Sequence, residues 1–309
     1  MGARPDTLVT VVIPAYNAEP FIAQAIGSVL SQDHGAVQLI VVDDGSTDRT
    51  GSIADSVDDP RLTLVSGPNR GVSRARNIGL ERANGESIGF LDADDYWLPN
   101  KLGVQLDALE EDPQLVAIGS LMRYESAQGR ILGTAGQPVS CDEQELIARA
   151  RLMPFPLSSI LFRTSVVADL GGFDEGLPGQ VEDLELLARV ASVGGIRCVP
   201  EVLGVYRIHG TSVSARDHTS QRAATRFVRA RLQERERGGD LSPEEFARSY
   251  RLGWRQSYGD WVQAWYRLAG LRAAERRWGG TIGYGSIALL AGPRYTVRRL
   301  LRQRGRARS

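Results

Sequence analysis

The sequence predicts an α/β protein with a Rossmann-like, mixed but mostly parallel sheet that is flanked by helices. Short apolar runs rich in β-branched residues alternate with helix-like segments through the first half of the chain. These runs are continuously apolar, as is typical of strands that are covered on both faces. Polar clusters follow three of the runs, and ligands of such sheets bind beyond the carboxyl ends of the strands.

The first half contains four expected strands, at residues 10–14, 39–44, 62–65 and 87–91. We expect one helix to open at Pro20 and another to run from about Ser73 to Gly85, since proline suits a first helical turn and glycine ends helices. Ser46, Thr47 and Asp48 are good helix caps after the second strand.

The pattern loosens in the second half. Further strands are expected at residues 116–122, 158–162, 196–199 and 202–208. A helix begins near Glu182, and the sequence becomes helical and arginine-rich beyond about Arg216. The chain therefore divides into an α/β part and a helical extension.

Composition excludes several classes of protein. The 309 residues have a net charge of zero, which gives no general attraction to nucleic acid. Cys141 and Cys198 form no CxxC pair and only three histidines are present, so we expect no zinc site and a reducing compartment. The only lysine, Lys101, follows no glycine run, which excludes a Walker A loop. No signal peptide or membrane-spanning stretch is evident, and we expect a cytoplasmic protein.

Three carboxylates stand close together in the stretch FLDADDYW, at Asp92, Asp94 and Asp95. Like charges this close need compensation near a core. Oxygen ligands without histidine or cysteine suit Mg²⁺ or Mn²⁺, which water and substrate phosphates would complete. Solvated turn residues, with Asp95 capping a helix, are the alternative.

Five motifs in this order resemble the inverting family 2 glycosyltransferases, which have the GT-A fold: VVIPAYN, VVDDGSTD, GVSRARNIGL, FLDADD and VEDLELLAR. The resemblance covers about residues 10–214. It implies a GT-A domain over residues 1–215, with a nucleotide-sugar half at about 8–122 and an acceptor half at about 123–215. Residues 216–309 form the helical extension.

The resemblance also implies which residues bind the nucleoside-diphosphate sugar donor. The segment Pro14, Ala15 and Tyr16 matches a loop that cradles the base, and Asp44, together with Asp43, matches the acid that binds the base. Arg76 matches a basic residue that faces the pyrophosphate, and His209 stands where relatives carry YRxH. A helix-terminal loop for the aspartates and a solvated surface arginine are the structural alternatives.

For the chemistry, the resemblance implies Asp92 near the ribose and metal, Asp94 as the metal ligand, and Asp95 as a substitute ligand. Glu182 and Asp183 match the family's ED motif, in which Asp183 would be the general base. Favourable placement of both acids at a helix N-terminus is the structural alternative. A single displacement would invert the anomeric centre of the sugar.

The implied acceptor is a glycan or glycolipid hydroxyl, because relatives commonly assemble cell-surface polysaccharide or glycolipid. The last sixteen residues carry seven arginines and no acid, so we also expect peripheral contact with the inner face of an anionic membrane. A solvated basic tail is the alternative.

Four other functions are alternatives to this interpretation. The DxD pattern also resembles that of phosphoaspartyl phosphatases, with Asp92 as nucleophile, but Tyr96 stands where that motif has threonine. A nucleotidyltransferase would need a glycine-rich, basic loop after the first strand, and a dinucleotide oxidoreductase a GxGxxG motif. A non-catalytic nucleotide-sugar-binding protein is the remaining alternative.

Overall fold

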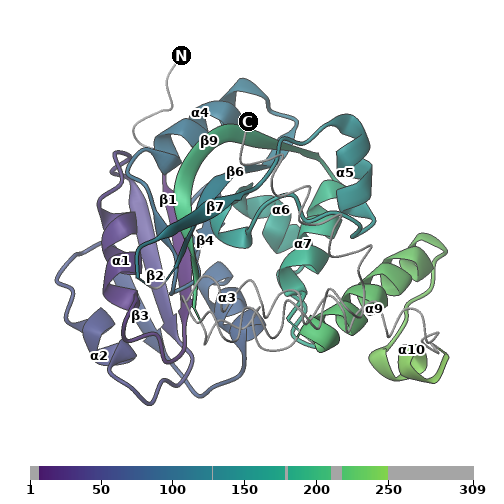
Figure 1. Ribbon diagram of the computed structural model, residues 1–309, viewed down its shortest axis with the longest axis horizontal. Coiled ribbons are helices and arrows are strands. Elements are labelled where there is room, and N and C mark those ends of the chain that lie inside the picture. The colour runs from purple at the N-terminus through teal and green to yellow at the C-terminus, as the bar shows by residue number, and fades with distance from the viewer. Residues whose placement is uncertain (1–6, 127, 178–179, 210–217, 250–309) are drawn as a thin grey trace. The chain divides into compact units, whose positions relative to one another are not determined.

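The structure is a computed structural model that describes residues 7–126, 128–177, 180–209 and 218–249 (Figure 1). These residues fall into two compact units. The larger unit comprises the described residues up to 123, together with 134–176 and 182–206. The smaller unit comprises 124–133, the described part of 177–181, and the described residues from 207 onward. The predicted boundary at 215–216 lies outside the described residues.

The strands are β1 (Val9–Ala15), β2 (Val37–Asp43), β3 (Leu62–Ser66), β4 (Ser87–Phe90), β5 (Tyr96–Trp97), β6 (Leu115–Ser126), β7 (Ile131–Ala135), β8 (Leu161–Arg163) and β9 (Gly195–Ile208). The α-helices are α1 (Ile22–Leu30), α2 (Thr50–Asp55), α3 (Val72–Leu80), α4 (Lys101–Glu111), α5 (Cys141–Ala148), α6 (Thr164–Asp169), α7 (Glu182–Ala191), α9 (His218–Glu236) and α10 (Pro243–Ser249). A 3₁₀ helix, η1, covers Leu157–Ser159.

Within the described residues the strands form one sheet in the order β3-β2-β1-β4-β8-β6-β9-β5, and β7 pairs with β6. The first four strands in this order are parallel. β8 is antiparallel to β4 and β6, and β5 is antiparallel to β9. The predicted α/β fold with a mixed sheet is confirmed.

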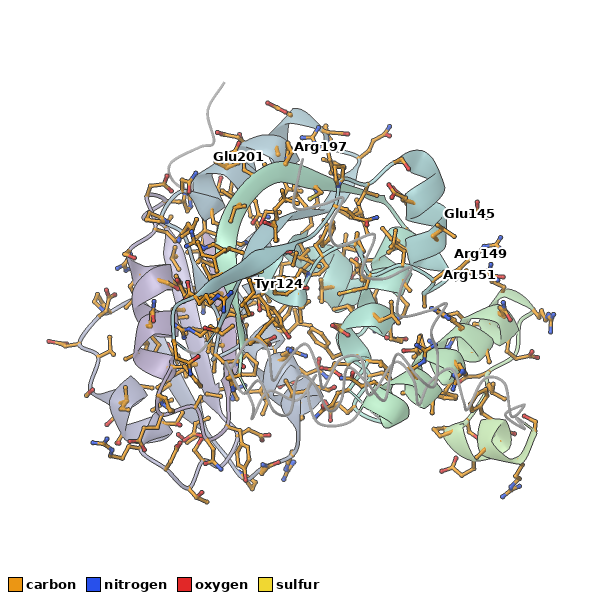
Figure 2. All side chains as sticks on the ribbon, viewed as in Figure 1. Tyr124, Glu145, Arg149, Arg151, Arg197 and Glu201 are labelled. Atoms are coloured by element: carbon orange, nitrogen blue, oxygen red, sulfur yellow. The ribbon has the colours of Figure 1, made fainter. Side chains whose placement is uncertain are left out.

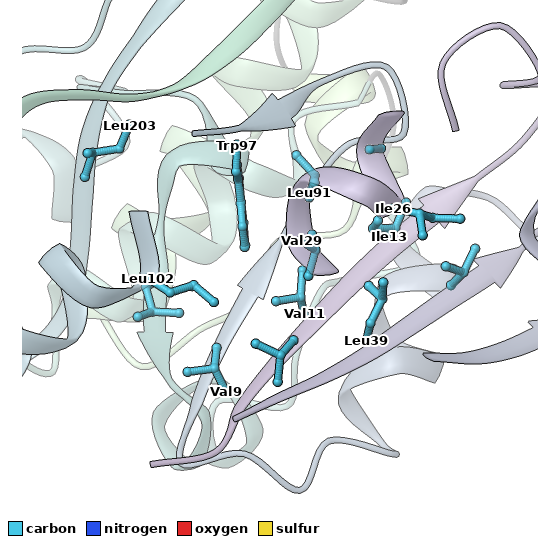
Figure 3. Close-up of a cluster of buried hydrophobic side chains, with 14 of the residues drawn as sticks. Val9, Val11, Ile13, Ile26, Val29, Leu39, Leu91, Trp97, Leu102 and Leu203 are labelled. Carbon is cyan, nitrogen blue, oxygen red and sulfur yellow. The ribbon is translucent and has the colours of Figure 1, made fainter. Parts of the chain in front are cut away.

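The sheet is covered on both faces because its strands are apolar on both. Alternate residues of β1, such as Val9 and Val11, pack with α1 and α4 in one core (Figure 3). Val12 instead packs with α3 and α7 in the core of the opposite face. Side chains on a strand alternate between faces, so one continuous apolar run serves both cores.

The only lysine of the chain is part of the first core. Lys101 is fully buried at the start of α4, with its ammonium 4.0 Å from the ring centroid of Trp97 and a hydrogen bond to Gln105. Burial lowers its pKa well below the usual range. Gln105 in turn donates to the carbonyls of Ile118 and Ser159, at 3.0 and 2.8 Å. Lys101 is therefore a core residue.

Four predicted elements differ from the observed ones. The strands expected at residues 196–199 and 202–208 are one strand, β9. Pro200 lies within β9, before Gly204 and Val205, the residues that pair with β5. The strand expected from residue 158 begins at Leu161, after η1, and the helix expected to reach Gly85 ends at Leu80.

In the smaller unit α9 and α10 pack through Phe227 and Phe246, whose ring centroids are 5.5 Å apart. Arg231 contacts Asp240 at 2.9 Å, and its hydrogen bond lowers the pKa of that carboxyl group. The predicted helical character after Arg216 is confirmed for α9 and α10. None of the helices in the described part of the chain is long and apolar enough to cross a membrane.

Two helical glycines give a matched test of how closely α3 approaches the sheet. A Cβ atom at Gly79 would lie 2.3 Å from a methyl carbon of Val12, whereas one at the exposed Gly27 of α1 would have no neighbour within 4 Å. We expect Gly79→Ala to lower the free energy of unfolding by about 1–3 kcal/mol, because the helix must move outward. Gly27→Ala should raise it by about 0.5–1 kcal/mol, because alanine favours the helix.

Urea unfolding of both variants measures these changes. A Gly79→Ala variant as stable as the parent chain would show that α3 does not contact β1 this closely.

Candidate active site

The polar clusters predicted to converge do so. They follow β1, β2 and β4, which are adjacent and parallel, so their carboxyl ends lie along one edge of the sheet. The backbone hydrogen bonds from Asp44 to Ala15 and from Leu91 to Val12, at 2.8 and 2.9 Å, extend these pairings beyond the strands. This edge is the candidate site.

The loops after β1 and β2 are joined by side-chain hydrogen bonds. Asn17 has a positive φ of 50°. Its side-chain oxygen accepts from the backbone amide of Thr47 at 2.8 Å, and its backbone amide donates to Ser46 Oγ at 3.0 Å. The expectation that Ser46 and Thr47 cap the next helix was wrong, because they bind Asn17 instead. Of the three predicted caps, Asp48 accepts from the amide of Thr50, the first residue of α2.

The predicted base-binding residues differ in exposure. Pro14 and Ala15 are buried within β1, so their side chains serve the core. Tyr16 comes directly after the strand, and its side chain is 51% exposed. Of this segment, Tyr16 alone offers a large exposed side chain to a ligand.

Asp43 and Asp44 are buried and bind backbone amides. The two carboxylate oxygens of Asp44 accept from Arg70 and Gly71 at 2.8 Å each, and Gly71 is the N-cap of α3. Asp43 accepts from Ser46 at 3.0 Å. Gly45, which directly follows Asp44, has a φ of 78°, and a Cβ there would lie 2.7 Å from the amide nitrogen of Asn69. The aspartates therefore order these loops, and their contact with a base stays a prediction.

Arg76 joins two of the predicted motifs. Its side chain, which points from α3, is only 5% exposed. One terminal nitrogen contacts Asp92 Oδ1 and the other contacts Glu182 Oε1, both at 2.7 Å. The guanidinium carbon also lies 5.2 Å from the ring centroid of Phe173. The structure thus brings Asp92 and Glu182 together through one buried cation.

This arrangement differs from the ion pairs at the surface. Figure 2 labels Glu145 of α5 and Arg149, the C-cap of that helix, which form an exposed pair at 3.0 Å. Such surface pairs contribute little to stability, with a typical value below about 1 kcal/mol. Removing the cation from a buried pair is far more costly, because it leaves carboxylates without compensation near the core. Arg76 therefore supplies much of the positive charge that the clustered acids require.

The pKa values of Arg76 and Asp92 depend on burial and on the charges of neighbouring side chains. Burial alone would lower the pKa of Arg76, but Asp92 and Glu182 raise it above its ordinary value. Burial raises the pKa of Asp92, Arg76 opposes that rise, and Asp94 and Glu182 add to it. A further cation beside Asp92 would act in the same direction as Arg76.

The three clustered aspartates lie in a turn rather than on the strand. β4 ends at Phe90, and the amide of Asp95 donates to the carbonyl of Asp92 at 2.9 Å to close the turn. The amide of Asp92 donates to Ser158 Oγ at 3.2 Å. Asp92 and Asp94 are partly exposed, whereas Asp95 is almost fully buried.

The turn suits a hard divalent cation. Asp92 and Asp94 supply carboxylate oxygens only, which Mg²⁺ and Mn²⁺ favour. Among the described residues, no group of three or more His, Cys, Asp or Glu side chains is placed to hold a metal. Water and a bound phosphate would therefore have to supply the remaining ligands, which is the usual habit of Mg²⁺ in proteins.

Asp183 has a raised pKa. It lies in the first turn of α7 and accepts from the amide of Leu184 at 2.7 Å. Burial, followed by the neighbouring charge of Glu182, raises its pKa to about 7. A carboxyl group with this pKa can accept a proton near neutral pH, where an ordinary aspartate is too weak a base.

Asn77 and Phe173 support the site but were not predicted. Asn77 follows Arg76 and binds the backbone of Phe173 twice, accepting from its amide at 2.8 Å and donating to its carbonyl at 2.9 Å. From α7, Arg189 donates to the carbonyls of Leu170 and Gly172 at 2.7 Å each. These bonds fix the loop that places Phe173 beside Arg76. Asn77 lies in the motif GVSRARNIGL, which pointed to this helix, but the contacts of Asn77 and Phe173 did not follow from spacing.

His209 directly follows β9 and belongs to the smaller unit. Its predicted contact with the donor stays a prediction.

Comparison with known proteins agrees with this site. The model of the family described as "Glycosyl transferase family 2" matches residues 10–167, which include the loops after β1, β2 and β4. The chain belongs to glycosyl transferase family 2. It is therefore a glycosyltransferase, and the phosphatase alternative has no support.

Three similar proteins illustrate the match. An uncharacterized glycosyltransferase of Nostoc sp. is 29% identical over 233 residues, or 73% of this chain and 71% of the relative. The structure of S. aureus TarS 1–349 in complex with UDP-GlcNAc has a TM-score of 0.56 at 20% identity, with 86% of this chain and 88% of that chain covered. The structure of the Pyrobaculum calidifontis mannosyltransferase PcManGT, in complex with GDP-Man and Mn²⁺, has a TM-score of 0.53 at 21% identity. The match covers 100% of this chain and 83% of that chain. The two structures share the fold, and the predicted GT-A fold is confirmed.

Proposed function

We propose that this family 2 glycosyltransferase transfers a sugar from a nucleoside-diphosphate sugar to a hydroxyl acceptor, with inversion and with a divalent metal. The observation that carries the proposal is the contact of Arg76 with both Asp92 and Glu182. It joins the acidic turn after β4 to the N-terminus of α7, where Asp183 lies. An acid that would bind the metal and a carboxyl group with a pKa of about 7, which would be the base, would then belong to one site.

The donor class is supported by the structural neighbours, which were determined with UDP-GlcNAc or with GDP-Man and Mn²⁺. In this chain the exposed ring of Tyr16 would contact the base, and Asp43 and Asp44 would order the surrounding loops while accepting from a ring N–H. Asp92 and Asp94 would hold Mn²⁺ or Mg²⁺. His209 would contact the diphosphate.

The chain's residues then perform three tasks. Asp183 accepts the proton of the acceptor hydroxyl as that oxygen attacks the anomeric carbon. Asp92 and Asp94 present their carboxylates to the metal, which when bound neutralises charge on the leaving diphosphate. The helices α3 and α7, which pack on the sheet, keep these groups at fixed positions. A single displacement inverts the anomeric configuration.

We propose a glycan or glycolipid acceptor, and a role in the assembly of surface polysaccharide or glycolipid. The family resemblance is the support for this proposal. The donor is best identified by thermal unfolding across UDP-, GDP- and dTDP-sugars with Mn²⁺, where one nucleotide should raise the melting temperature. A melting temperature that no nucleotide sugar raises would contradict the proposed function. Binding without transfer to any hydroxyl would instead favour the non-catalytic alternative.

Asp183→Asn should fold and bind donor but lose about 10²–10⁴-fold in kcat, since asparagine cannot accept the proton. Because the pKa of Asp183 is raised to about 7, the carboxyl group is protonated below that pH. For the parent chain, kcat/KM should therefore fall as the pH decreases through about 7. Release of nucleoside diphosphate, measured across pH, tests both expectations.

Glu185→Gln is unsuitable as a control, because Glu185 pairs with Arg189 in the same helix. Asp174→Asn, outside α7, is a better one and should keep the acidic limb of the profile. Near-normal transfer by Asp183→Asn would remove Asp183 as the base.

Asp94→Ala should abolish the dependence of donor binding on Mn²⁺, because the turn loses a carboxylate that binds the cation directly. Calorimetric titration of the stabilising nucleotide, with and without Mn²⁺, measures this. Asp58→Ala, an exposed aspartate before β3, is the matched control and should keep the metal dependence. Equal donor affinity of the parent chain with and without Mn²⁺ would defeat the metal assignment.

We also propose that the basic C-terminal segment contacts an anionic membrane surface. Its support is the sequence alone, since residues 294–309 lie outside the described residues. The seven arginines would be attracted to acidic lipid headgroups, and the attraction should weaken as salt is added.

Deletion of residues 294–309 should reduce partitioning onto vesicles that contain phosphatidylserine, because most of this basic charge is removed. Sedimentation with these vesicles measures the change, and neutral vesicles are the control. Unchanged partitioning of the shortened chain would contradict the proposal.

A further inference from the structure

The guanidinium group of Arg76 is occupied and enclosed. Each terminal nitrogen makes a 2.7 Å contact with a carboxylate, and the side chain is only 5% exposed. Among the described residues its Nε is buried and has no hydrogen-bond partner. The ring of Phe173 lies 5.2 Å from the guanidinium carbon. An arginine that binds a diphosphate would need to turn at least part of its fork toward the ligand.

The two carboxylates come from segments that the chain itself does not hold together. Asp92 lies 16 residues after Arg76, in the turn after β4, whereas Glu182 lies 106 residues after it, at the start of α7. Glu182 is buried and directly precedes Asp183. A displacement of the guanidinium would therefore alter the position of the DADD turn and of the α7 N-terminus together.

We propose that Arg76 is a positioning residue, which fixes Asp183 relative to Asp92 by holding Glu182 and Asp92 with one buried guanidinium. This inference rests on the proposed function and gives Arg76 a role other than direct contact with the pyrophosphate. Glu182 is the second part of this arrangement. Its carboxylate links Arg76 of α3 to α7, the helix that carries Asp183.

The surroundings of Arg76 prevent the bridge from shifting. Asn77 holds the backbone of Phe173 on both sides, and Arg189 holds the preceding carbonyls of Leu170 and Gly172. Gly172 has a φ of 69°, and a Cβ there would lie 2.5 Å from Asn77 Oδ1. The loop is thus clamped by α3 and α7, the same helices that Arg76 and Glu182 join.

Lysine cannot replace this arginine. A guanidinium presents several donors in a rigid plane, so it can bind two carboxylates in different directions at fixed geometry. An ammonium on a flexible stem keeps the charge but not the fixed directions. Arg76→Lys therefore separates the loss of bridging from the loss of positive charge.

The experiment compares Arg76→Lys, Glu182→Gln and the double variant with the parent chain. The donor is the UDP-, GDP- or dTDP-sugar that stabilises the parent chain. We expect the Kd of the corresponding nucleoside diphosphate with Mn²⁺ to stay within about threefold. We expect kcat to fall by about 10²-fold in each single variant, since small misplacements of catalytic groups have losses of this size.

The double variant should be no slower than the slower single variant, because both changes break one bridge. Arg82→Lys, on an exposed arginine just after α3, is the control and should keep the parental kcat. If Arg76→Lys does not fold, Glu182→Gln decides alone, because it removes the carboxylate that Arg76 holds at the start of α7 while it keeps the size of the side chain. Glu182→Gln should then lower kcat without raising the Kd of the nucleoside diphosphate.

Four results would overturn the positioning role. A tenfold or greater loss of nucleotide affinity in Arg76→Lys, with kcat kept at saturating donor, would make Arg76 a phosphate ligand. Multiplicative losses in the double variant would show independent roles. Parental kcat in a folded Arg76→Lys, or in Glu182→Gln, would show that the bridge is not needed. These outcomes leave the proposed function intact, whereas a parent chain that neither binds nucleotide sugars nor transfers sugar overturns both.

Discussion

The candidate site depends on one buried guanidinium between two carboxylates. Carboxylates beside the core need a partner, and Arg76 contacts both Asp92 and Glu182 at 2.7 Å. Because these acids belong to the turn after β4 and to α7, the position of α3 governs both. Asp44 sets that position by binding the amides of Arg70 and Gly71 at the start of the helix, and Gly79 allows close approach to Val12.

The edge of the parallel sheet was predictable because it follows from local pattern. Runs such as residues 39–44 are β-branched and apolar, so they had to be strands covered on both faces, and the polar residues after them had to share an edge. The motifs also led to Arg76, Asp92 and Glu182 individually. The interpretation failed where local preference competes with tertiary contacts. Ser46 and Thr47 favour helix caps, yet Asn17 offers them partners from the neighbouring loop.

The partners of Arg76 could not be deduced from spacing. Its distance in sequence from Glu182 is 106 residues, and no periodicity connects α3 with α7. A solvated arginine and a phosphate ligand were both reasonable interpretations of SRARN, because Arg70, Arg74 and Arg76 are close together. In the structure Arg74 instead contacts Glu81 and Glu175 near the surface. Burial distinguishes these arginines, and burial depends on the assembled fold rather than on the motif.

The energetics of a buried ion cluster favour a positioning role over a stabilising one. Desolvation of a guanidinium and two carboxylates consumes most of their mutual attraction, and apolar replacements of similar volume often stabilise a protein at least as well. Stability alone would therefore not require Arg76 at this place. What apolar side chains cannot provide is direction, since packing tolerates small displacements whereas two hydrogen-bonded ion pairs fix the orientation of both acids. A site that needs its base and its metal-binding acid at a fixed separation has a use for that direction. Burial raises the pKa of Asp92, and Asp94 and Glu182 add to that rise, so a second cation beside this turn would act in the same direction as Arg76.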